Sequence, residues 1–249
     1  MKGASGAFVN LNGDRVSKIC NDAFFQVEWF GLAAQHGLVA GVRVPAAELL
    51  ALREYHMEFI RGHCATSELS VMFLETLLKQ VMVWREVPPQ TAGSWDSYIT
   101  RLEEHVAAGD TPEMREALRI VQAAEPLPAS FCHGDFTLEN ILIESDGTCV
   151  LLDPNYKRGL FQSYVLDLGK LLQSTHARYH EVFCSHHGVD LSRHDNWLCR
   201  KLRELGVWRE SLLSCISHVM RLRKYRPEEQ RPLVDALLRD LTSEYERTL

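Results

Sequence analysis

The first sixty residues carry short strand-like runs that are separated by turn residues. The run Arg15–Ile19 places Lys18 between two apolar positions, and the Asn12-Gly13 pair directly before it is a strong hairpin signal. Residues 22–36 differ, because aromatic and aliphatic side chains recur there at helical spacing, with Asp22 as a suitable N-cap. This part of the chain therefore predicts a hairpin followed by a helix.

The next segments predict two more strands, over residues 42–45 and 55–62, around a short helix at 46–52. From residue 66 onward the hydrophobic period becomes helical. Residues 67–84, 95–106 and 112–124 carry apolar side chains about one turn apart, with prolines between them, and the remainder to 249 is also helical. The pattern predicts an α+β chain: a small antiparallel β lobe with one helix (1–62), then a mainly helical lobe (63–249).

Composition narrows the class of protein. The 249 residues have a formal net charge of −6, which argues against general nucleic-acid binding. No apolar run approaches the ~20 residues of a membrane span, and the N-terminus lacks the apolar core of a signal peptide. Seven cysteines stand singly at irregular spacing, which is typical of reduced thiols. We therefore expect a cytoplasmic protein without a membrane span.

The strongest chemical signal lies between residues 131 and 155. His133-Gly134-Asp135 reads as a loop, Asn140 follows five residues after the aspartate, and an apolar hairpin then ends at Asp153. Two carboxylates and an amide oxygen at neighbouring strand ends can hold a divalent cation and orient a hydroxyl group. Mg²⁺ prefers such oxygen ligands and shares them with phosphate.

These residues resemble the catalytic and metal motifs of the aminoglycoside phosphotransferase and choline kinase family. That family has the two-lobed protein-kinase-like fold, with His-Gly-Asp in place of His-Arg-Asp and a metal-binding aspartate that Phe-Gly does not usually follow. The resemblance implies an ATP-dependent phosphotransferase, with Asp135 as the catalytic base and Asn140 and Asp153 holding Mg²⁺. It also implies that Asp167, which opens a later helix, braces the catalytic loop.

The same resemblance implies a nucleotide site in the N-terminal lobe. Lys18 matches the lysine that pairs with the phosphates, and Glu28 is the candidate for the helix glutamate that pairs with this lysine. The alternative for Glu28 is an exposed helix carboxylate. A glycine turn lets backbone N–H groups approach phosphate, and the hinge between the lobes binds adenine through its backbone. These roles fall to Gly3, Ser5 and Gly6 in the turn, and to Glu58 and Ile60 at the hinge. The first strand of such a lobe is expected to be truncated or missing.

The phosphate acceptor is less constrained than the reaction. The C-terminal helices mix both signs of charge, and Arg221, Arg223, Lys224 and Arg226 form a basic cluster. That cluster is either a solvated face or a surface toward an anionic substrate. We expect a sugar or related metabolite rather than an aminoglycoside. ATP is the expected cofactor, with GTP as the alternative, and the sequence leaves the oligomeric state open.

Two further interpretations stay open. The short N-terminal lobe could mark a pseudokinase that binds a nucleotide or a partner without turnover. Retention of Lys18, Asp135, Asn140 and Asp153 together favours the active enzyme. His186, His187 and His194 lack the ligand spacing of a zinc site, so we expect solvated loop histidines.

Overall fold

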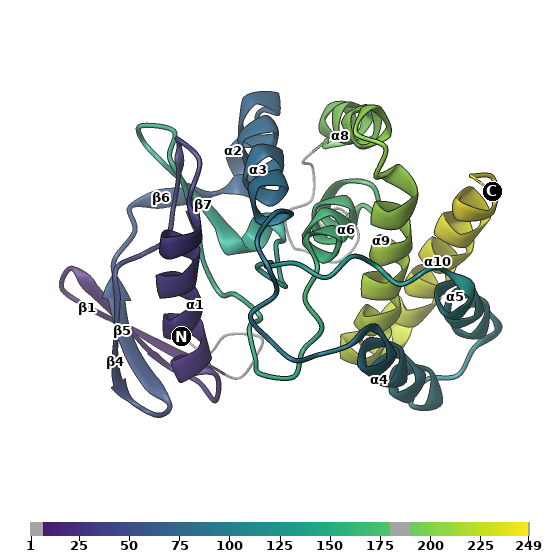
Figure 1. The fold of residues 1–249 in the computed structure, drawn as a ribbon, viewed down its shortest axis with the longest axis horizontal. Coiled ribbons are helices and arrows are strands. Elements are labelled where there is room, and N and C mark those ends of the chain that lie inside the picture. The colour runs from purple at the N-terminus through teal and green to yellow at the C-terminus, as the bar shows by residue number, and fades with distance from the viewer. Residues whose placement is uncertain (1–6, 180–189, 249) are drawn as a thin grey trace. The chain divides into compact units, whose positions relative to one another are not determined.

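The computed structural model describes residues 7–179 and 190–248, and the chain divides into two compact units (Figure 1). The first unit comprises residues 1–87 and 133–157, and the second comprises 88–132 and 158–249. Residues 133–157 carry the predicted catalytic and metal motif, so this motif packs within the same unit as Lys18. The predicted boundary at residue 62 separates a nucleotide-binding lobe from a catalytic lobe, and it stays a prediction. The packing units are defined differently, and the first of them continues to Val87.

A four-stranded antiparallel sheet begins the first unit. Its order is β1-β2-β5-β4, and the predicted hairpin is confirmed, since Gly13 adopts φ +65° between the first two strands. Lys18 lies on β2 directly opposite Tyr55 of β5. The strands are β1 (Phe8–Asn12), β2 (Arg15–Ile19), β4 (Ala47–Ala51) and β5 (Glu54–Glu58).

The helix predicted at residues 46–52 is wrong, because this segment forms β4. Its alanines and leucines favour a helix, but seven residues are too few for a stable isolated helix in water. A tight turn at Leu52-Arg53 instead folds the segment back on β5, with Ala47 opposite Met57 and Leu49 opposite Tyr55. Strand pairing therefore outweighs the local helix propensity.

A second sheet, of order β3-β8-β7-β6, carries the motif segment. β7 and β8 form an antiparallel hairpin in which Ile141 pairs with Leu151, and β3 joins β8 in parallel. The predicted loop, strand, turn and strand around residues 131–155 are thus confirmed. The strands are β3 (Val42–Arg43), β6 (Gly62–Cys64), β7 (Ile141–Glu144) and β8 (Cys149–Leu151).

Two long helices pack in the first unit and supply its aromatic core. The helix predicted over 22–36 is confirmed as α1 (Ala23–His36), which lies against β4 and β5. The helix predicted over 67–84 is divided into α2 (Ala65–Glu68) and α3 (Val71–Trp84), because Ser70 caps α3 by accepting a hydrogen bond from Phe73 N–H. Trp29 of α1 and Trp84 of α3 are fully buried, with ring centroids 5.7 Å apart.

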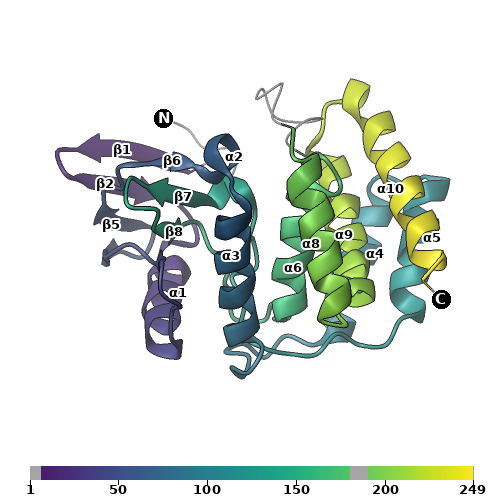
Figure 2. The same cartoon turned by 90° about the horizontal axis from the view of Figure 1, so that it is seen from above.

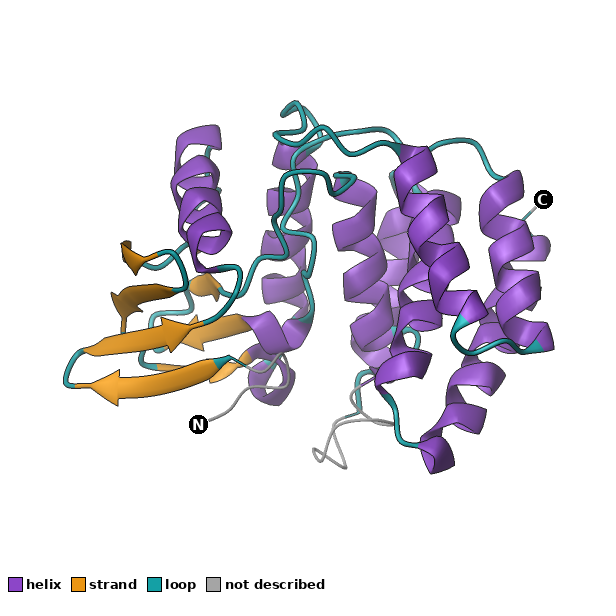
Figure 3. Ribbon diagram, turned by 90° about the horizontal axis from the view of Figure 1, so that it is seen from below, coloured by secondary structure: helices purple, strands orange, loops and turns teal. Residues whose placement is uncertain are grey.

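Within the described residues of the second unit, all regular secondary structure is helical, and Figure 3 shows the strands confined to the other part of the chain. α6 and α9 pack closely, as Figure 2 shows. Gly169 allows this approach because it has no side chain: a Cβ atom there would overlap the Oγ atom of Ser214. The helices are α4 (Trp95–Ala107), α5 (Pro112–Ala123), α6 (Tyr164–Thr175), α8 (Ser192–Glu204), α9 (Trp208–Leu222) and α10 (Arg231–Glu246). Short 3-10 turns at Arg223–Tyr225 and Glu228–Gln230 lie between α9 and α10. Within the described ranges, no helix is both long enough and apolar enough to cross a membrane.

Candidate active site

Two backbone hydrogen bonds hold the His133–Asn140 loop against the segment that follows β8. The N–H of Asn155 donates to the carbonyl of His133 at 3.0 Å, and the N–H of Leu152 donates to the carbonyl of Asn140 at 2.8 Å. The loop ends in a 3-10 turn, Leu138–Asn140, from which β7 begins. Asp135 and Asn140 are therefore brought to the same end of the β7–β8 hairpin as Asp153.

Gly134 makes this close approach possible. It adopts φ +79°, and a Cβ atom at this position would lie 2.6 Å from the carbonyl oxygen of Asn155. Any other residue would meet a backbone atom rather than a flexible side chain, and it would also adopt an unfavourable left-handed conformation. The glycine of the His-Gly-Asp motif is thus required by the contact between two backbone segments.

The carboxylate of Asp135 is oriented by Asn140. The amide Nδ2 of Asn140 donates to the backbone carbonyl of Asp135 at 2.9 Å and to its Oδ2 atom at 3.0 Å. With Nδ2 occupied, the amide oxygen Oδ1 of Asn140 has no hydrogen-bond partner within residues 7–179 and 190–248. Asn140 thus orients the carboxylate of the predicted base, and its role as a metal ligand stays a prediction.

His133 anchors the loop as a buried, neutral side chain. Its ring is fully buried against the edges of Trp29 and Phe136, at centroid distances of 4.8 and 5.5 Å. Burial lowers the pKa of His133 to about 4, so the imidazole is uncharged at neutral pH. Its Nδ1 atom accepts the N–H of Asp135 at 3.3 Å, which sets the backbone direction of the predicted base.

Lys18 points at the same segment. Its side chain is almost fully buried, and its Nζ atom forms an ion pair with Asp153 and donates to Gln26 Oε1 at 3.2 Å. The Tyr55 hydroxyl donates to the same Gln26 oxygen at 2.7 Å. Lys18 and Asp153 are 135 residues apart in sequence, so this pair joins the β1–β5 sheet to the motif segment.

The helix partner of Lys18 in this structure is Gln26 rather than Glu28. Two residues along a helix differ by roughly 200° in direction, so the two side chains cannot both face Lys18. The Oε2 atom of Glu28 is buried and has no hydrogen-bond partner in the described part of the chain. A role for Glu28 at the nucleotide stays a prediction. Gln26 and Tyr55 were missed because neutral side chains carry no signature of a phosphate site.

The donors at Asp153 suit a hard divalent cation. Asp153 adopts φ +52°, which is uncommon for a residue with a side chain, and its side chain is 46% exposed although Lys18 contacts one carboxylate oxygen. A half-exposed carboxylate and the amide oxygen of Asn140 are both oxygen ligands of the kind that Mg²⁺ accepts. The residues therefore fit Mg²⁺ by donor chemistry.

The remaining predicted nucleotide contacts fall in two places. Gly3, Ser5 and Gly6 lie outside the described residues. The N–H of Glu58 already donates to the carbonyl of Ala46 at 3.0 Å, and its carboxylate pairs with Arg43. Ile60 is buried after the end of β5. Adenine contacts at Glu58 and Ile60 stay predictions, and the Glu58 N–H would have to leave its present partner.

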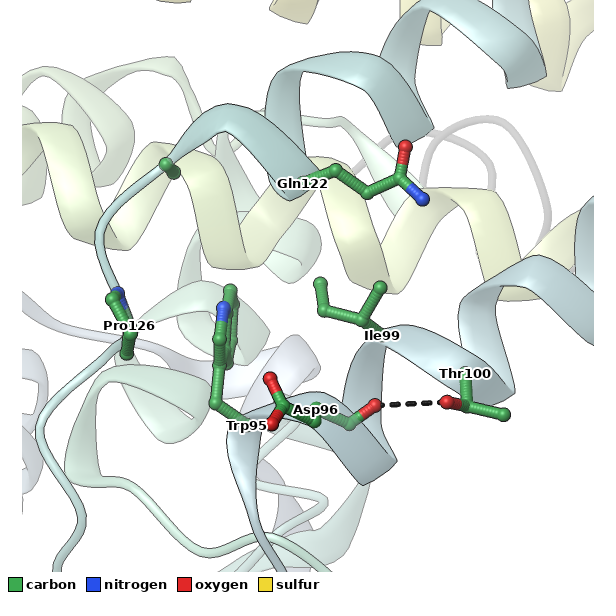
Figure 4. Close-up of a pocket in the computed structure, with 7 residues that line it drawn as sticks. Trp95, Asp96, Ile99, Thr100, Gln122 and Pro126 are labelled. Atoms are coloured by element: carbon green, nitrogen blue, oxygen red, sulfur yellow. Dashed lines mark hydrogen bonds between the residues drawn. The ribbon is translucent and has the colours of Figure 1, made fainter.

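A hollow in the second unit contains none of these groups. It has a volume of about 390 Å³ and lies beside α4 and the end of α5, as Figure 4 shows. Its lining residues are Trp95, Asp96, Ile99, Thr100, Gln122, Ala124 and Pro126. With a single carboxylate, it offers no constellation for group transfer. None of the residues predicted for catalysis or metal binding lines this hollow.

An aspartate held by an asparagine on a His-Gly-Asp loop, beside an aspartate that pairs with a buried lysine, fits a phosphotransferase of protein-kinase-like fold. A comparison with protein-family models agrees with this class, since the model of the phosphotransferase enzyme family matches residues 8–158, more than half of the chain. The protein belongs to this family. The resemblance noted from the His133–Asn140 motif is thereby confirmed.

Comparison with solved structures confirms the α+β kinase-like fold. An aminoglycoside phosphotransferase bound to GDP and kanamycin has a TM-score of 0.64 at 11% identity, covering 96% of this chain and 90% of the other. A putative fructosamine-3-kinase from Haemophilus somnus 129PT has a TM-score of 0.62 at 11% identity, covering 97% and 89%. An ethanolamine kinase from Plasmodium vivax has a TM-score of 0.55 at 10% identity, covering 98% and 83%. A search of curated protein sequences finds no match.

Proposed function

We propose that this protein transfers the γ-phosphate of ATP to a hydroxyl group of a sugar or related small metabolite. The family supplies the class of reaction, a phosphotransferase acting on an alcohol group. The observation that carries the finer assignment is the fixed carboxylate of Asp135, which Asn140 holds at 3.0 Å on a loop bonded to the Asp153 segment.

In this mechanism Asp135 accepts or orients the proton of the acceptor hydroxyl. Phosphoryl transfer has a loose transition state, so aiming the nucleophile matters more than deprotonating it fully. Asn140 and the N–H contact to His133 keep the Asp135 carboxylate and its backbone in place before substrate arrives. Preorganisation of this kind lowers the reorganisation needed during the reaction.

Lys18 and Asp153 act on the phosphates. The Nζ atom of Lys18 supplies a positive charge that is desolvated by burial and therefore acts strongly on a phosphate oxygen. Asn140 and Asp153 would hold Mg²⁺, which neutralises charge on the β- and γ-phosphate oxygens when bound. Gln26 positions Lys18 through a hydrogen bond rather than through charge, and Tyr55 in turn donates to the same Gln26 oxygen.

ATP is the favoured phosphate donor, with GTP as the alternative. Structures with the same fold include one aminoglycoside phosphotransferase in a ternary complex with ATP and another with GDP. The residues proposed to contact the base are Glu58, the last residue of β5, and Ile60 just after it, and they would do so through the backbone rather than through diagnostic side chains. Competition between the two nucleotides in a binding titration would decide between them.

A group of positive charges in the second unit supports an anionic acceptor. Burial, Lys224, Arg221 and Arg101 together lower the pKa of His105 to about 4. Neither Arg101 nor Arg221 has a salt-bridge partner in the described ranges, whereas Arg223 pairs with Asp235. The members of the basic cluster therefore differ. The charge of Arg223 is taken up by the ion pair with Asp235, whereas Arg221 is available to bind an anion. This charge favours a sugar phosphate or acidic metabolite over a polycationic aminoglycoside.

The Asp135→Asn variant tests the proposal. Asparagine keeps the size of the side chain but cannot accept the hydroxyl proton, so nucleotide binding should persist while phosphoryl transfer falls by about 10²–10⁴-fold. Transfer should be measured against panels of sugars, sugar phosphates, amino alcohols and aminoglycosides. Wild-type turnover by Asp135→Asn would refute the base, and preferred transfer to an aminoglycoside would refute the acceptor class.

A second candidate is a pseudokinase that binds nucleotide without turnover. The observation that favours it is the neutral Gln26, which leaves Asp153 as the anion that pairs with Lys18. A thermal-shift titration with Mg-ATP followed by a single-turnover assay separates the two functions. Stabilisation without transfer to any acceptor in the panels would support the pseudokinase.

A further inference from the structure

A second cluster of metal-ligating side chains lies in the second unit, among residues that the proposed reaction does not use. His176 follows directly after α6, and Asp195 and Cys199 lie one turn apart on α8. Within the described ranges, these three residues form the one group whose nitrogen, oxygen and sulfur atoms approach within 4.8 Å of one another. All three belong to the same packed unit, so their geometry does not depend on the first unit.

The distances match a small tetrahedral ion. The Nδ1 atom of His176 lies 3.0 Å from Asp195 Oδ2 and 3.6 Å from Cys199 Sγ, and this sulfur lies 3.3 Å from Asp195 Oδ1. Zinc bonds of about 2.0–2.3 Å place neighbouring ligand atoms roughly 3.3–3.8 Å apart in a tetrahedron. The cluster thus needs only small side-chain shifts to hold such an ion.

Glu244 of α10 completes the arrangement. Its Oε2 atom lies 2.8 Å from Nε2 of His176, the ring nitrogen that faces away from Asp195. A carboxylate in this place fixes the proton on Nε2 and turns Nδ1 into a metal ligand, which is how histidine ligands are generally oriented. The side chains of His176 and Asp195 are 19% and 22% exposed, so an ion can reach them from solvent.

We propose that His176, Asp195 and Cys199 bind a zinc ion, with Glu244 as the orienting group and water in the fourth position. Mixed nitrogen, sulfur and oxygen donors favour zinc over magnesium or calcium, which take oxygen alone. Binding displaces one proton from His176 and one from the Cys199 thiol to solvent. The ion links the end of α6 to α8 and, through Glu244, to α10.

The competing arrangement contains no metal. Burial lowers the pKa of His176, but the hydrogen bonds with Asp195 and Cys199 outweigh it and raise this pKa to about 11. An imidazolium held between two carboxylates is then a structural ion pair. The two states differ in a measurable way, because only zinc binding requires the thiolate of Cys199.

The experiment uses the tag-free full chain, stripped with a chelator and then titrated with Zn²⁺ or Co²⁺. We expect one ion per chain, a thiolate-to-cobalt charge-transfer band, and an increase in melting temperature of about 5–10 °C at zinc a hundredfold above Kd. Cys199→Ser should abolish the band, and Asp195→Asn and Glu244→Gln should each weaken affinity by about 10–100-fold. None of these measurements depends on phosphotransferase activity.

Cys64→Ser is the matched control, because it removes a described, half-buried thiol that belongs to the first unit. It should leave the band, the stoichiometry and the affinity unchanged. Absence of metal binding by the wild-type chain would overturn the proposal in favour of the ion pair. Loss of the band in Cys64→Ser, or its persistence in a folded Cys199→Ser chain, would also overturn it.

Discussion

Replacing Gly134 with alanine should separate the predicted catalytic loop from the segment that carries Asp153. Gly134 adopts φ +79°, and a left-handed conformation costs a residue with a side chain about 1–2 kcal/mol. The new Cβ would also lie 2.6 Å from the carbonyl oxygen of Asn155, which must move away. Loss of the hydrogen bond from Asn155 N–H to His133 adds about 0.5–1.5 kcal/mol. We expect the free energy of unfolding to fall by about 1.5–3.5 kcal/mol.

Gly13→Ala is the control for this change. Gly13 has a similar φ of +65°, but no atom lies within 4 Å of the position its Cβ would take. The free energy of unfolding of Gly13→Ala should fall only by the conformational cost of about 1–2 kcal/mol, without a steric contribution. Urea denaturation followed by tryptophan fluorescence measures both variants on the same scale, since Trp29 and Trp84 lie in the core of this unit.

Activity gives the sharper comparison between the two glycine variants. A displacement approaching 1 Å between catalytic groups can lower turnover by about 10²-fold. Gly134→Ala should therefore lose phosphoryl transfer by that order at temperatures where it remains folded, while Gly13→Ala keeps wild-type turnover. If the two variants matched in stability and in turnover, the close approach to Asn155 would have no role and the reasoning would be refuted.

Three further outcomes follow from the same site. Asp153→Ala should weaken Mg-nucleotide binding at least tenfold in calorimetry, and unchanged binding would exclude Asp153 as a ligand. Gln26→Leu leaves the Lys18 and Tyr55 donors without their acceptor and should lower the free energy of unfolding by about 1–3 kcal/mol in urea, whereas Gln26→Glu should lower it less. His133 is neutral when folded, with its pKa near 4 against 6.5 when unfolded, so stability should fall by up to about 3 kcal/mol as pH drops from 6.5 to 4. His133→Phe should remove that part of the pH dependence, and an identical acid profile would contradict the burial argument.

Local signals predicted the parts of the fold that local physics determines. The Asn12-Gly13 turn, the helical spacing of apolar residues in α1 and α4, and the β7–β8 hairpin all follow from spacing and turn chemistry within a few residues. The motif from His133 to Asp153 could be predicted from the sequence for the same reason. Its polar residues stand at the ends of short apolar strands, where the chain must leave the sheet.

The errors lie where tertiary contacts or helix register decide the outcome. β4 was predicted as a helix because its pairing with β5 is invisible in its own composition. Gln26 rather than Glu28 contacts Lys18 in the structure. The negative charge of Glu28 made it the predicted partner, but the direction of the helix turns Gln26 toward the lysine. The role of Glu28 at the nucleotide stays a prediction.

The cluster around His176 was missed for a different reason. The histidines singled out in the sequence were His186, His187 and His194, which lack the ligand spacing of a zinc site; the first two lie outside the described residues, and His194 lies on α8. Asp195 and Cys199 do carry a local signal, since residues four apart share a helix face. Their histidine partner comes from the end of α6, and only the packing of α6 on α8 brings it near.

The neutral Gln26 has a consequence for how the site is charged. Among the described residues, the ion-pair partner shown for Lys18 is Asp153, the same carboxylate that is predicted to bind the metal. A cation arriving alone would have to compete with the buried Lys18 for that carboxylate. A nucleotide phosphate instead offers Lys18 a second anion and thereby frees charge on Asp153. We therefore expect metal and nucleotide to bind this chain as a pair, each raising the affinity for the other, because linkage between two ligands is reciprocal.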